Sequence, residues 1–162
     1  MSTLEVKAIQ APSGYDLQMP AGHILQVVRQ AASIVETSST SYVDLYSATI
    51  TPKFASSKIF IMVTNHVYVT SYTSNNWRGA QVQVLRGTSN IYDGGNYGEA
   101  AHLASSTDSY MTYSSFHLLD SPATTSATTY YVKGKSKVSS SISFNNSGYA
   151  GTGGITLMEV AG

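Results

Sequence analysis

The chain has 162 residues, which is enough for one sizeable core and too few for two comfortable domains. Only 11% of the residues are Asp, Glu, Lys or Arg and the formal net charge is +0, so the basic stripe expected of a nucleic-acid binder is absent. The lack of cysteine excludes disulfides and thiolate metal sites, and no apolar run approaches the roughly 20 residues that insertion into a membrane requires.

The first 21 residues differ from the rest. Leu4, Val6 and Ala8 alternate with charged residues as in a short strand, and prolines and glycines then follow at turn-like spacing. No basic region followed by an apolar core marks a secretory signal. Because this segment is too short for a core of its own, we predict that residues 1–21 form a docking arm whose Leu4, Val6 and Ile9 contact a neighbouring subunit or scaffold. The alternative is a first edge strand of the main sheet.

Residues 22–162 carry the pattern of one all-β head domain. Short segments rich in Val, Ile, Thr and Tyr recur every 8 to 12 residues or so with turn residues between them, which is typical of a sandwich or barrel. We predict about eight strands in an antiparallel β-sandwich of jelly-roll type. The predicted strands are 24–29, 42–51, 57–72, 81–84, 110–119, 128–138, 141–145 and 154–160.

Two details of these strands can be predicted from residue types. The apolar positions of the second strand change parity near Tyr46 and Ser47, which indicates a β-bulge, and Pro52 ends that strand because proline cannot donate to the ladder. Ala and Leu cluster at 99–104, where we predict the one helical turn.

The segment from Lys58 to Val63 is apolar on both faces, whereas a strand with one buried face should alternate apolar and polar residues. A second layer of the chain or another subunit must cover the other face, and no long amphipathic helix is available to do so. We therefore predict a homotrimer. Its interface is assigned to Phe60, Ile61 and Met62 in this strand and to Ile155 and Leu157 in the closing strand.

No residue constellation predicts a reaction. The four histidines lack the short spacings of a metal site, no Gly-x-Ser-x-Gly elbow is present, and the glycine clusters lack the ending of a phosphate loop. The nine acidic residues fall in no recognisable pair, although a glycosidase remains an alternative. We predict a non-enzymatic protein with no catalytic residue, no cofactor and no metal ligand.

Loops that mix aromatic and amide side chains are the best candidates for contact with a host surface. One holds Trp77, the single tryptophan, and the other holds Tyr92, Asp93, Asn96 and Tyr97. Tyrosine and tryptophan offer large rigid contact areas, and Asn, Ser and Gly offer adaptable hydrogen bonds. We predict that these five residues bind a host glycan or protein. For Trp77 the alternative is a place in the core beneath its own loop.

Several segments resemble the C-terminal head domain of tail-fibre and other virion structural proteins of tailed bacteriophages, particularly those of marine type. Their order and spacing carry the resemblance, which covers most of the chain from Gly22 onward. The matching segments are Gly22 to Val28, Tyr42 to Asp44, Ser47 to Pro52, Ser56 to Ile59, Asp120 to Pro122, Thr128 to Val132 and Ile155 to Val160.

This resemblance implies a trimeric β-sandwich head that is made in the host cytoplasm, displayed on a virion and concerned with host attachment. Fibre chains of this kind usually carry a long stalk or anchoring domain before the head, whereas only 21 residues precede it here. We therefore expect a short tail fibre or tail-tip head whose partners are its own copies and other tail or capsid proteins. The alternatives are a capsid decoration or adaptor protein and a free glycan-binding, lectin-like module.

Overall fold

The computed structural model describes residues 20–69, 77–95, 100–103, 109–138, 141–145 and 153–162. Eleven strands and no helix occur in these ranges. The strands are β1 (Ile24–Ala31), β2 (Val35–Thr37), β3 (Val43–Ile50), β4 (Lys58–Val69), β5 (Trp77–Arg86), β6 (Ser89–Asp93), β7 (Ala100–Leu103), β8 (Tyr110–Asp120), β9 (Thr128–Ser136), β10 (Ile142–Phe144) and β11 (Gly154–Val160).

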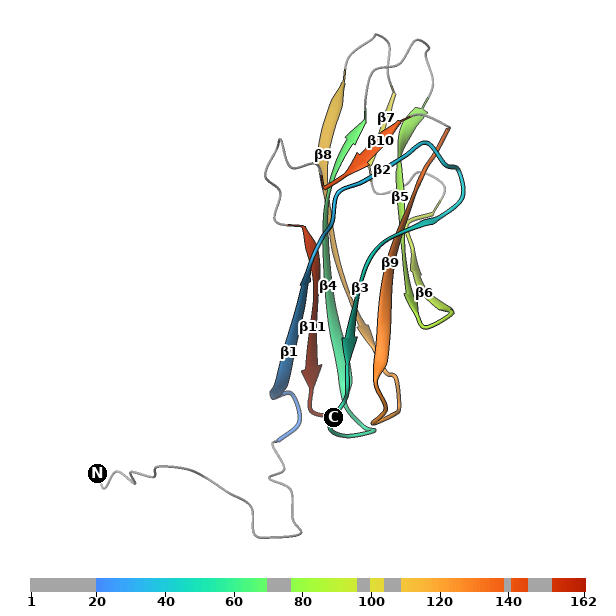
Figure 1. Cartoon of the computed structure of the whole chain (residues 1–162). Helices are drawn as coiled ribbons and strands as arrows, with labels where there is room; N and C mark the ends of the chain where they lie inside the picture. The colour runs from blue at the N-terminus through green and yellow to red at the C-terminus, as the bar shows by residue number, and fades with distance from the viewer. Residues whose placement is uncertain (1–19, 70–76, 96–99, 104–108, 139–140, 146–152) are drawn as a thin grey trace, which may run out of the picture.

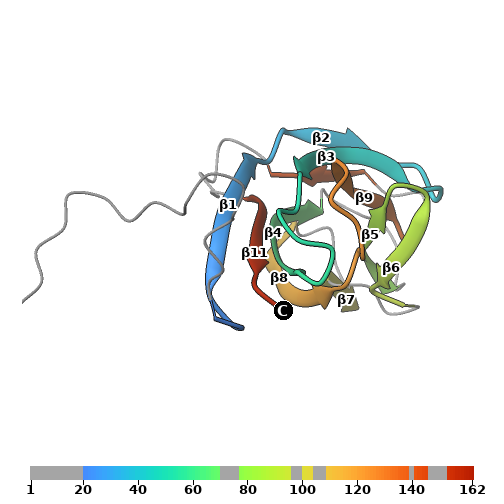
Figure 2. The same ribbon diagram turned by 90° about the horizontal axis from the view of Figure 1, so that it is seen from below.

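The strands form two antiparallel sheets that face each other, as the view along the long axis shows (Figure 2). The larger sheet has the order β1-β11-β4-β10-β2, with β8 paired to the other edge of β4. The smaller sheet has the order β3-β9-β5-β6, with β7 paired to β5. Figure 1 shows β4 running through the middle of the larger sheet, with β3 and β9 of the smaller sheet to its right. The predicted antiparallel β-sandwich is confirmed.

Alternation of side chains explains the core. In β9 every second residue is buried, from Thr128 to Ser136, so that Tyr130 and Val132 point between the sheets while Tyr131 and Lys133 point outward. The same alternation in β3, β4, β5 and β11 fills the space between the layers with β-branched and aromatic side chains, as a pleated strand dictates.

Most predicted strands are present within a few residues of their predicted ends, and three strands were missed. These three are β2, β6 and β7. The predicted helical turn at 99–104 is wrong, because Ala100–Leu103 is a strand paired with the start of β5. The bulge is confirmed as a register shift between Asp44 and Tyr46, and β3 ends before Pro52. The docking residues Leu4, Val6 and Ile9 lie outside the described residues.

Candidate assembly interface

The two faces of β4 differ in exposure. Ile59, Ile61 and Val63 point between the sheets and are 0% exposed, whereas Phe60 is half-buried on the outer face and Met62 is 43% exposed there. Around Phe60 and Met62 no second layer of the described chain covers that outer face, whereas His66, which has the same outward parity farther along β4, is 0% exposed. The strand that is apolar on both sides therefore presents one side to the core and the other to the exterior of the molecule.

This result corrects part of the predicted oligomer interface. Ile61, Ile155 and Leu157 are each 0% exposed in a single chain and belong to its core, so they cannot form a surface between subunits. They share the inward parity of their strands. Only Phe60 and Met62, which have the opposite parity, lie where another molecule can contact them.

A row of apolar residues crosses four strands of the larger sheet in register. Val27 of β1 pairs with Met158 of β11, Met158 pairs with Phe60 of β4, and Phe60 pairs with Leu119 of β8. Val27 and Leu119, at the two ends of the row, are 56% and 55% exposed. Directly opposed residues have Cβ atoms about 5 Å apart, so the four side chains form a continuous ridge.

Neighbouring rows extend this surface. Met62 pairs with His117 in the next row, and the Phe60 and His117 rings are 5.5 Å apart. Among the described residues, six of the eight large apolar side chains that are exposed lie on this side of the larger sheet. We call this surface the apolar face and define it by Ile24, Val27, Phe60, Met62, Met111, Tyr113, Leu119, Met158 and Val160.

The outer face of the smaller sheet has the opposite character. Its outward positions include Ser47 and Thr49 of β3, Gln83 of β5 and Lys133 and Lys135 of β9. The hydroxyls of Thr49 and Thr129 lie 2.8 Å apart in a hydrogen bond on this surface. The sandwich therefore has one outer face suited to water and one suited to burial.

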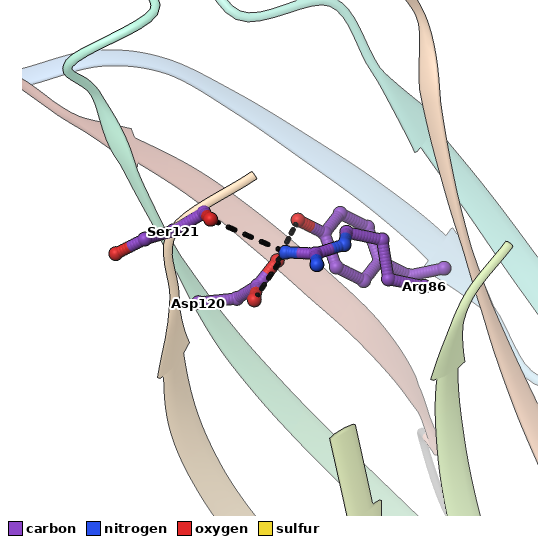
Figure 3. A network of polar contacts seen from close by, with 4 residues as sticks. Arg86, Asp120 and Ser121 are labelled. Carbon is purple, nitrogen blue, oxygen red and sulfur yellow. Dashed lines mark hydrogen bonds and ion pairs between the residues drawn. The ribbon is translucent and has the colours of Figure 1, made fainter. Parts of the chain in front are cut away.

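Buried polar networks close the end of the sandwich at which β1 begins and β11 ends. The Asp120 carboxylate at the end of β8 accepts hydrogen bonds from Arg86 Nη1 at 2.7 and 2.9 Å and from the Tyr130 hydroxyl at 2.7 Å. Arg86 also donates to the Ser121 carbonyl at 3.3 Å (Figure 3). The network ties β8 of the larger sheet to β5 and β9 of the smaller one. The pKa of the Tyr130 hydroxyl is raised mainly by burial and also by the neighbouring Asp120 carboxylate, while the charge of Arg86 acts to lower it.

A second carboxylate in this region holds the loop between β3 and β4. Glu159 is 0% exposed and accepts hydrogen bonds from Gln26 Nε2 at 2.6 Å, from the Lys53 N–H at 2.7 Å and from the Phe54 N–H at 3.4 Å. Burial acts to raise the pKa of Glu159, but the hydrogen bonds outweigh it and hold the pKa below its usual value.

The two carboxylates occupy one inward-facing row, because Ile59 pairs with Glu159 on one side and with Asp120 on the other. Their backbones are thus two strand spacings, or about 9.6 Å, apart. Each carboxylate already accepts from two or more donors that join separate elements. The arrangement fastens the end of the sandwich. Neither residue lies in a catalytic motif, and the one signal in the sequence is that Glu159 shares the parity of Ile155 and Leu157.

Another buried network lies between the sheets farther along β4. The Tyr46 hydroxyl donates to Asn65 Oδ1 at 2.7 Å, and Asn145 Nδ2 donates to the same oxygen at 3.3 Å. Asn145 Oδ1 in turn accepts from the His66 N–H at 3.0 Å. Burial raises the pKa of the Tyr46 hydroxyl, with the hydrogen bond to Asn65 acting in the opposite sense. This network fixes the register of β4 against β3 and the end of β10.

Of the residues predicted to bind a host surface, Trp77 and Asp93 lie at different levels of the smaller sheet. Trp77 is the first residue of β5 and pairs with Leu103, while Asp93 ends β6 and pairs with Gln83. Six residues of β5 separate these two levels, which is about 20 Å along a strand. The Trp77 side chain, Asn96 and Tyr97 lie outside the described residues.

Tyr92 and Asp93 point in opposite directions from β6. The Tyr92 ring stacks on Phe116 inside the sandwich with a centroid distance of 4.1 Å, which corrects its assignment to a recognition surface. Asp93 is exposed and accepts a hydrogen bond from the Tyr42 hydroxyl at 3.1 Å. Lys135 Nζ lies over the Tyr42 ring, 4.5 Å from its centroid. Of the five predicted residues, Asp93 is the one whose side chain the structure places on an outer surface.

Within the described ranges, no group of three His, Cys, Asp or Glu side chains is placed to hold a metal ion. His23 bonds the Pro20 carbonyl at 3.0 Å, His66 is buried 5.3 Å from the Tyr113 ring, and His117 lies on the apolar face. Burial lowers the pKa of His66. The described part of the chain also contains no helix that is long and apolar enough to cross a membrane.

Comparison with models of protein families finds no match, and comparison with curated proteins finds none at a significant level. Among solved structures, a protein of the T13 particle of infectious bursal disease virus is similar to 97% of this chain, with a TM-score of 0.53 and 11% identity. A protein of the Gt strain of that virus gives a TM-score of 0.47 at 12% identity and 97% coverage. The chain spans 36% and 38% of those two proteins, and the likeness to the first is one of fold alone.

Proposed function

We propose that this protein is a virion structural component that assembles with copies of itself through the apolar face. The single observation that carries the proposal is the in-register apolar row of Val27, Met158, Phe60 and Leu119 on the outer side of a sheet. Exposed contiguous apolar patches mark interaction sites because water is excluded from them at a gain in free energy. The similarity in fold to a virus-particle protein supports the same conclusion.

The apolar face has the dimensions of an interface core. Four strands about 4.8 Å apart lie side by side over Ser115 to Leu119, an area of roughly 200 to 250 Å², and β4 and β8 carry the surface on as far as Met111. A standard interface buries about 800 Å² on each partner, with an apolar centre inside a polar rim. Lys58 and Arg29, which are exposed beside the apolar rows, supply such a rim.

A second copy is the occupant that we propose. The face contains no acidic side chain that would select a basic partner, and the chain as a whole is neutral, so association depends on apolar burial rather than on attraction between opposite charges. Three-fold assembly, which the tail-fibre resemblance implies, would bury the apolar face and leave the polar face of the smaller sheet outward.

Within the virion we propose a short tail fibre or tail-tip head concerned with host attachment, held by the arm of residues 1–21. A capsid decoration or adaptor protein is the alternative that the fold similarity to a particle protein favours. Quantitative mass spectrometry of purified particles, with antibody labelling in the electron microscope, distinguishes them. A tail component would occur in few copies at the tail, and a decoration protein in many copies over the shell; absence from particles would refute both.

Sedimentation velocity tests the assembly directly. Met62→Asp and Leu119→Asp place a charge on the apolar face, and because both positions are exposed in one chain the folded subunit should tolerate them. We expect the wild type to sediment as a trimer and both variants as folded monomers with unchanged circular dichroism. Thr49→Asp, on the opposite outer face, is the matched control and should remain a trimer.

A wild type that stays monomeric at micromolar concentration, or variants that still form trimers, would overturn the proposed interface. Binding of the wild type, but not of Leu119→Asp, to neutral lipid vesicles in the absence of self-association would assign the face to a membrane surface instead of a second copy.

A further inference from the structure

The outer face of the smaller sheet holds a pocket that no part of the assembly uses. Its volume is about 370 Å³, and it is lined by Asp44, Leu85, Gly87, Thr88, Tyr131 and Lys133. Pockets of 300 Å³ and above are large enough for small organic ligands. The pocket lies on the side of the sandwich opposite the apolar face, so assembly through that face leaves it open.

Strand pairing explains why these residues meet. Asp44 of β3 pairs with Lys133 of β9, and Tyr131, two residues earlier in β9, pairs with Leu85 of β5. All four side chains point outward from the same sheet. The pocket is therefore built on three adjacent strands, which hold its side chains more rigidly than a loop would.

The turn between β5 and β6 forms one wall. Gly87 and Thr88 connect Arg86 to Ser89, and Gly87 has a φ of +57°, which a two-residue hairpin requires and which glycine adopts without strain. The Gly87 N–H donates to the Thr129 carbonyl of β9 at 2.9 Å. This bond ties the turn to the sheet and holds Thr88 at the edge of the pocket.

The lining combines the groups that recognise a sugar ring. The Tyr131 ring and Leu85 offer an apolar surface for the C–H face of a pyranose, while the Asp44 carboxylate, the Lys133 ammonium and the Thr88 hydroxyl can bond its hydroxyl groups. Asp44 and Lys133 form an ion pair at 2.8 Å, and the Asp44 side chain is 73% exposed and keeps acceptor positions for a ligand. The pocket is lined by one acidic and one basic side chain and so carries no net charge, which favours an uncharged ligand over a phosphate or a nucleic acid.

We infer that the pocket beside Tyr131 binds a single uncharged pyranose unit of a glycan. This inference deepens the proposed function by naming the ligand class of a surface that the assembled protein would turn outward. Asp93, hydrogen-bonded to Tyr42 and in the row of Asp44, Lys133 and Gln83, borders the same face and can contact further units of the glycan.

Saturation-transfer difference NMR on the full chain tests the inference. The probes are the methyl glycosides of glucose, galactose, mannose and N-acetylglucosamine, with sialyllactose as the acidic probe. A single pyranose, at a typical ligand efficiency, should bind with a Kd on the order of 1 mM. We expect one or more neutral glycosides to bind with transfer strongest at the protons of one ring face, as stacking on Tyr131 requires.

Asp44→Asn and Tyr131→Ala should each weaken binding at least about tenfold, because each removes a contact that specifies the ligand. Thr49→Ala, on the same face but outside the pocket, is the control and should bind as the wild type does. Asp44 is highly exposed, so its variant should fold even if Tyr131→Ala does not. The absence of transfer to all neutral probes, undiminished binding by Asp44→Asn, or binding of sialyllactose alone would overturn the inference.

The same measurements separate this inference from the proposed function. Loss of glycan binding with intact trimers and intact particle incorporation would refute the pocket and leave the virion assignment standing. Glycan binding by a chain that never associates and is absent from particles would refute the virion assignment and leave a lectin-like module.

Discussion

Replacing Asp120 by alanine should cost far more stability than replacing Asp44, although both carboxylates form ion pairs of nearly equal length. The Arg86–Asp120 distance is 2.7 Å and the Lys133–Asp44 distance is 2.8 Å. The Asp120 side chain is only 10% exposed, whereas that of Asp44 is 73% exposed. Water screens the second pair strongly and reaches the first only on the side of Arg86, whose side chain is 32% exposed.

The size of the stability loss in Asp120→Ala depends on the polar groups that lose their partner. Asp120→Ala removes the acceptor of the Tyr130 hydroxyl, which belongs to a residue that is 0% exposed, and leaves Arg86 with the Ser121 carbonyl at 3.3 Å. Breaking a buried pair costs about 3 to 5 kcal/mol, and since the Arg86 side chain is 32% exposed we expect about 3 kcal/mol. Asp44→Ala should cost about 0 to 1 kcal/mol.

Urea denaturation followed by far-ultraviolet circular dichroism provides the free energies, at one fixed protein concentration because oligomers are stabilised by mass action. The Asp120→Ala melting temperature should fall by roughly 6 to 12 °C, and that of Asp44→Ala by no more than about 4 °C. A double-mutant cycle with Tyr130→Phe should show coupling of about 1 kcal/mol between Asp120 and the hydroxyl. Equal losses for the two aspartate variants would refute the assignment of Asp120 as the fastener of this end.

Because the pKa of Glu159 is held below its usual value in the fold, its contribution to stability is present above the unfolded pKa of about 4.3 and is lost as the pH falls through the lower folded value. The wild type should therefore lose more free energy of unfolding on acidification than Glu159→Gln, and parallel losses would contradict this. Gly134→Ala should cost about 1 to 3 kcal/mol in urea denaturation, because a Cβ there would lie 2.5 Å from Phe144 Cζ and 3.0 Å from Leu45 Cδ1; an unchanged midpoint would show that the core yields. Deletion of residues 1–21 should leave the circular dichroism unchanged and abolish incorporation into particles, and unfolding of the truncated chain would make the arm an integral strand.

The sandwich was predictable wherever alternation was strong, and least so where strands depend on their neighbours. The bulge and the end of the second predicted strand could be predicted because their causes are local. The parity of the apolar residues changes at Tyr46, and Pro52 has no N–H to donate. The segment Ala100–Leu103 has the composition of a helix, and pairing with β5 makes it a strand. Ser89–Asp93 has too few apolar residues to be distinguished from a turn.

The assembly surface was predictable in part. The two-sided apolar pattern from Lys58 to Val63 correctly indicated a face that the described chain does not cover, but the pattern alone cannot tell which parity points inward, so Ile61 was grouped with Phe60 and Met62. Glu159 has the inward parity of Ile155 and Leu157, and a carboxylate at such a position is a signal of a buried hydrogen-bonded network.

The pairing of residues 22 and 23 with residue 161 has a mechanical consequence. The Gly22 N–H donates to the Ala161 carbonyl at 2.8 Å and the Ala161 N–H donates to the His23 carbonyl at 2.8 Å, at the end of the antiparallel pair β1 and β11 (Figure 1). A force that pulls residues 22 and 161 apart acts along the hydrogen bonds and breaks them one after another, as a zipper opens. A force that pulls on residue 22 against the far end of the sandwich loads the bonds of β1 in shear and all together. The domain should therefore yield easily when it is stretched between residues 22 and 161, and resist when residue 22 is pulled against the opposite end of the sandwich.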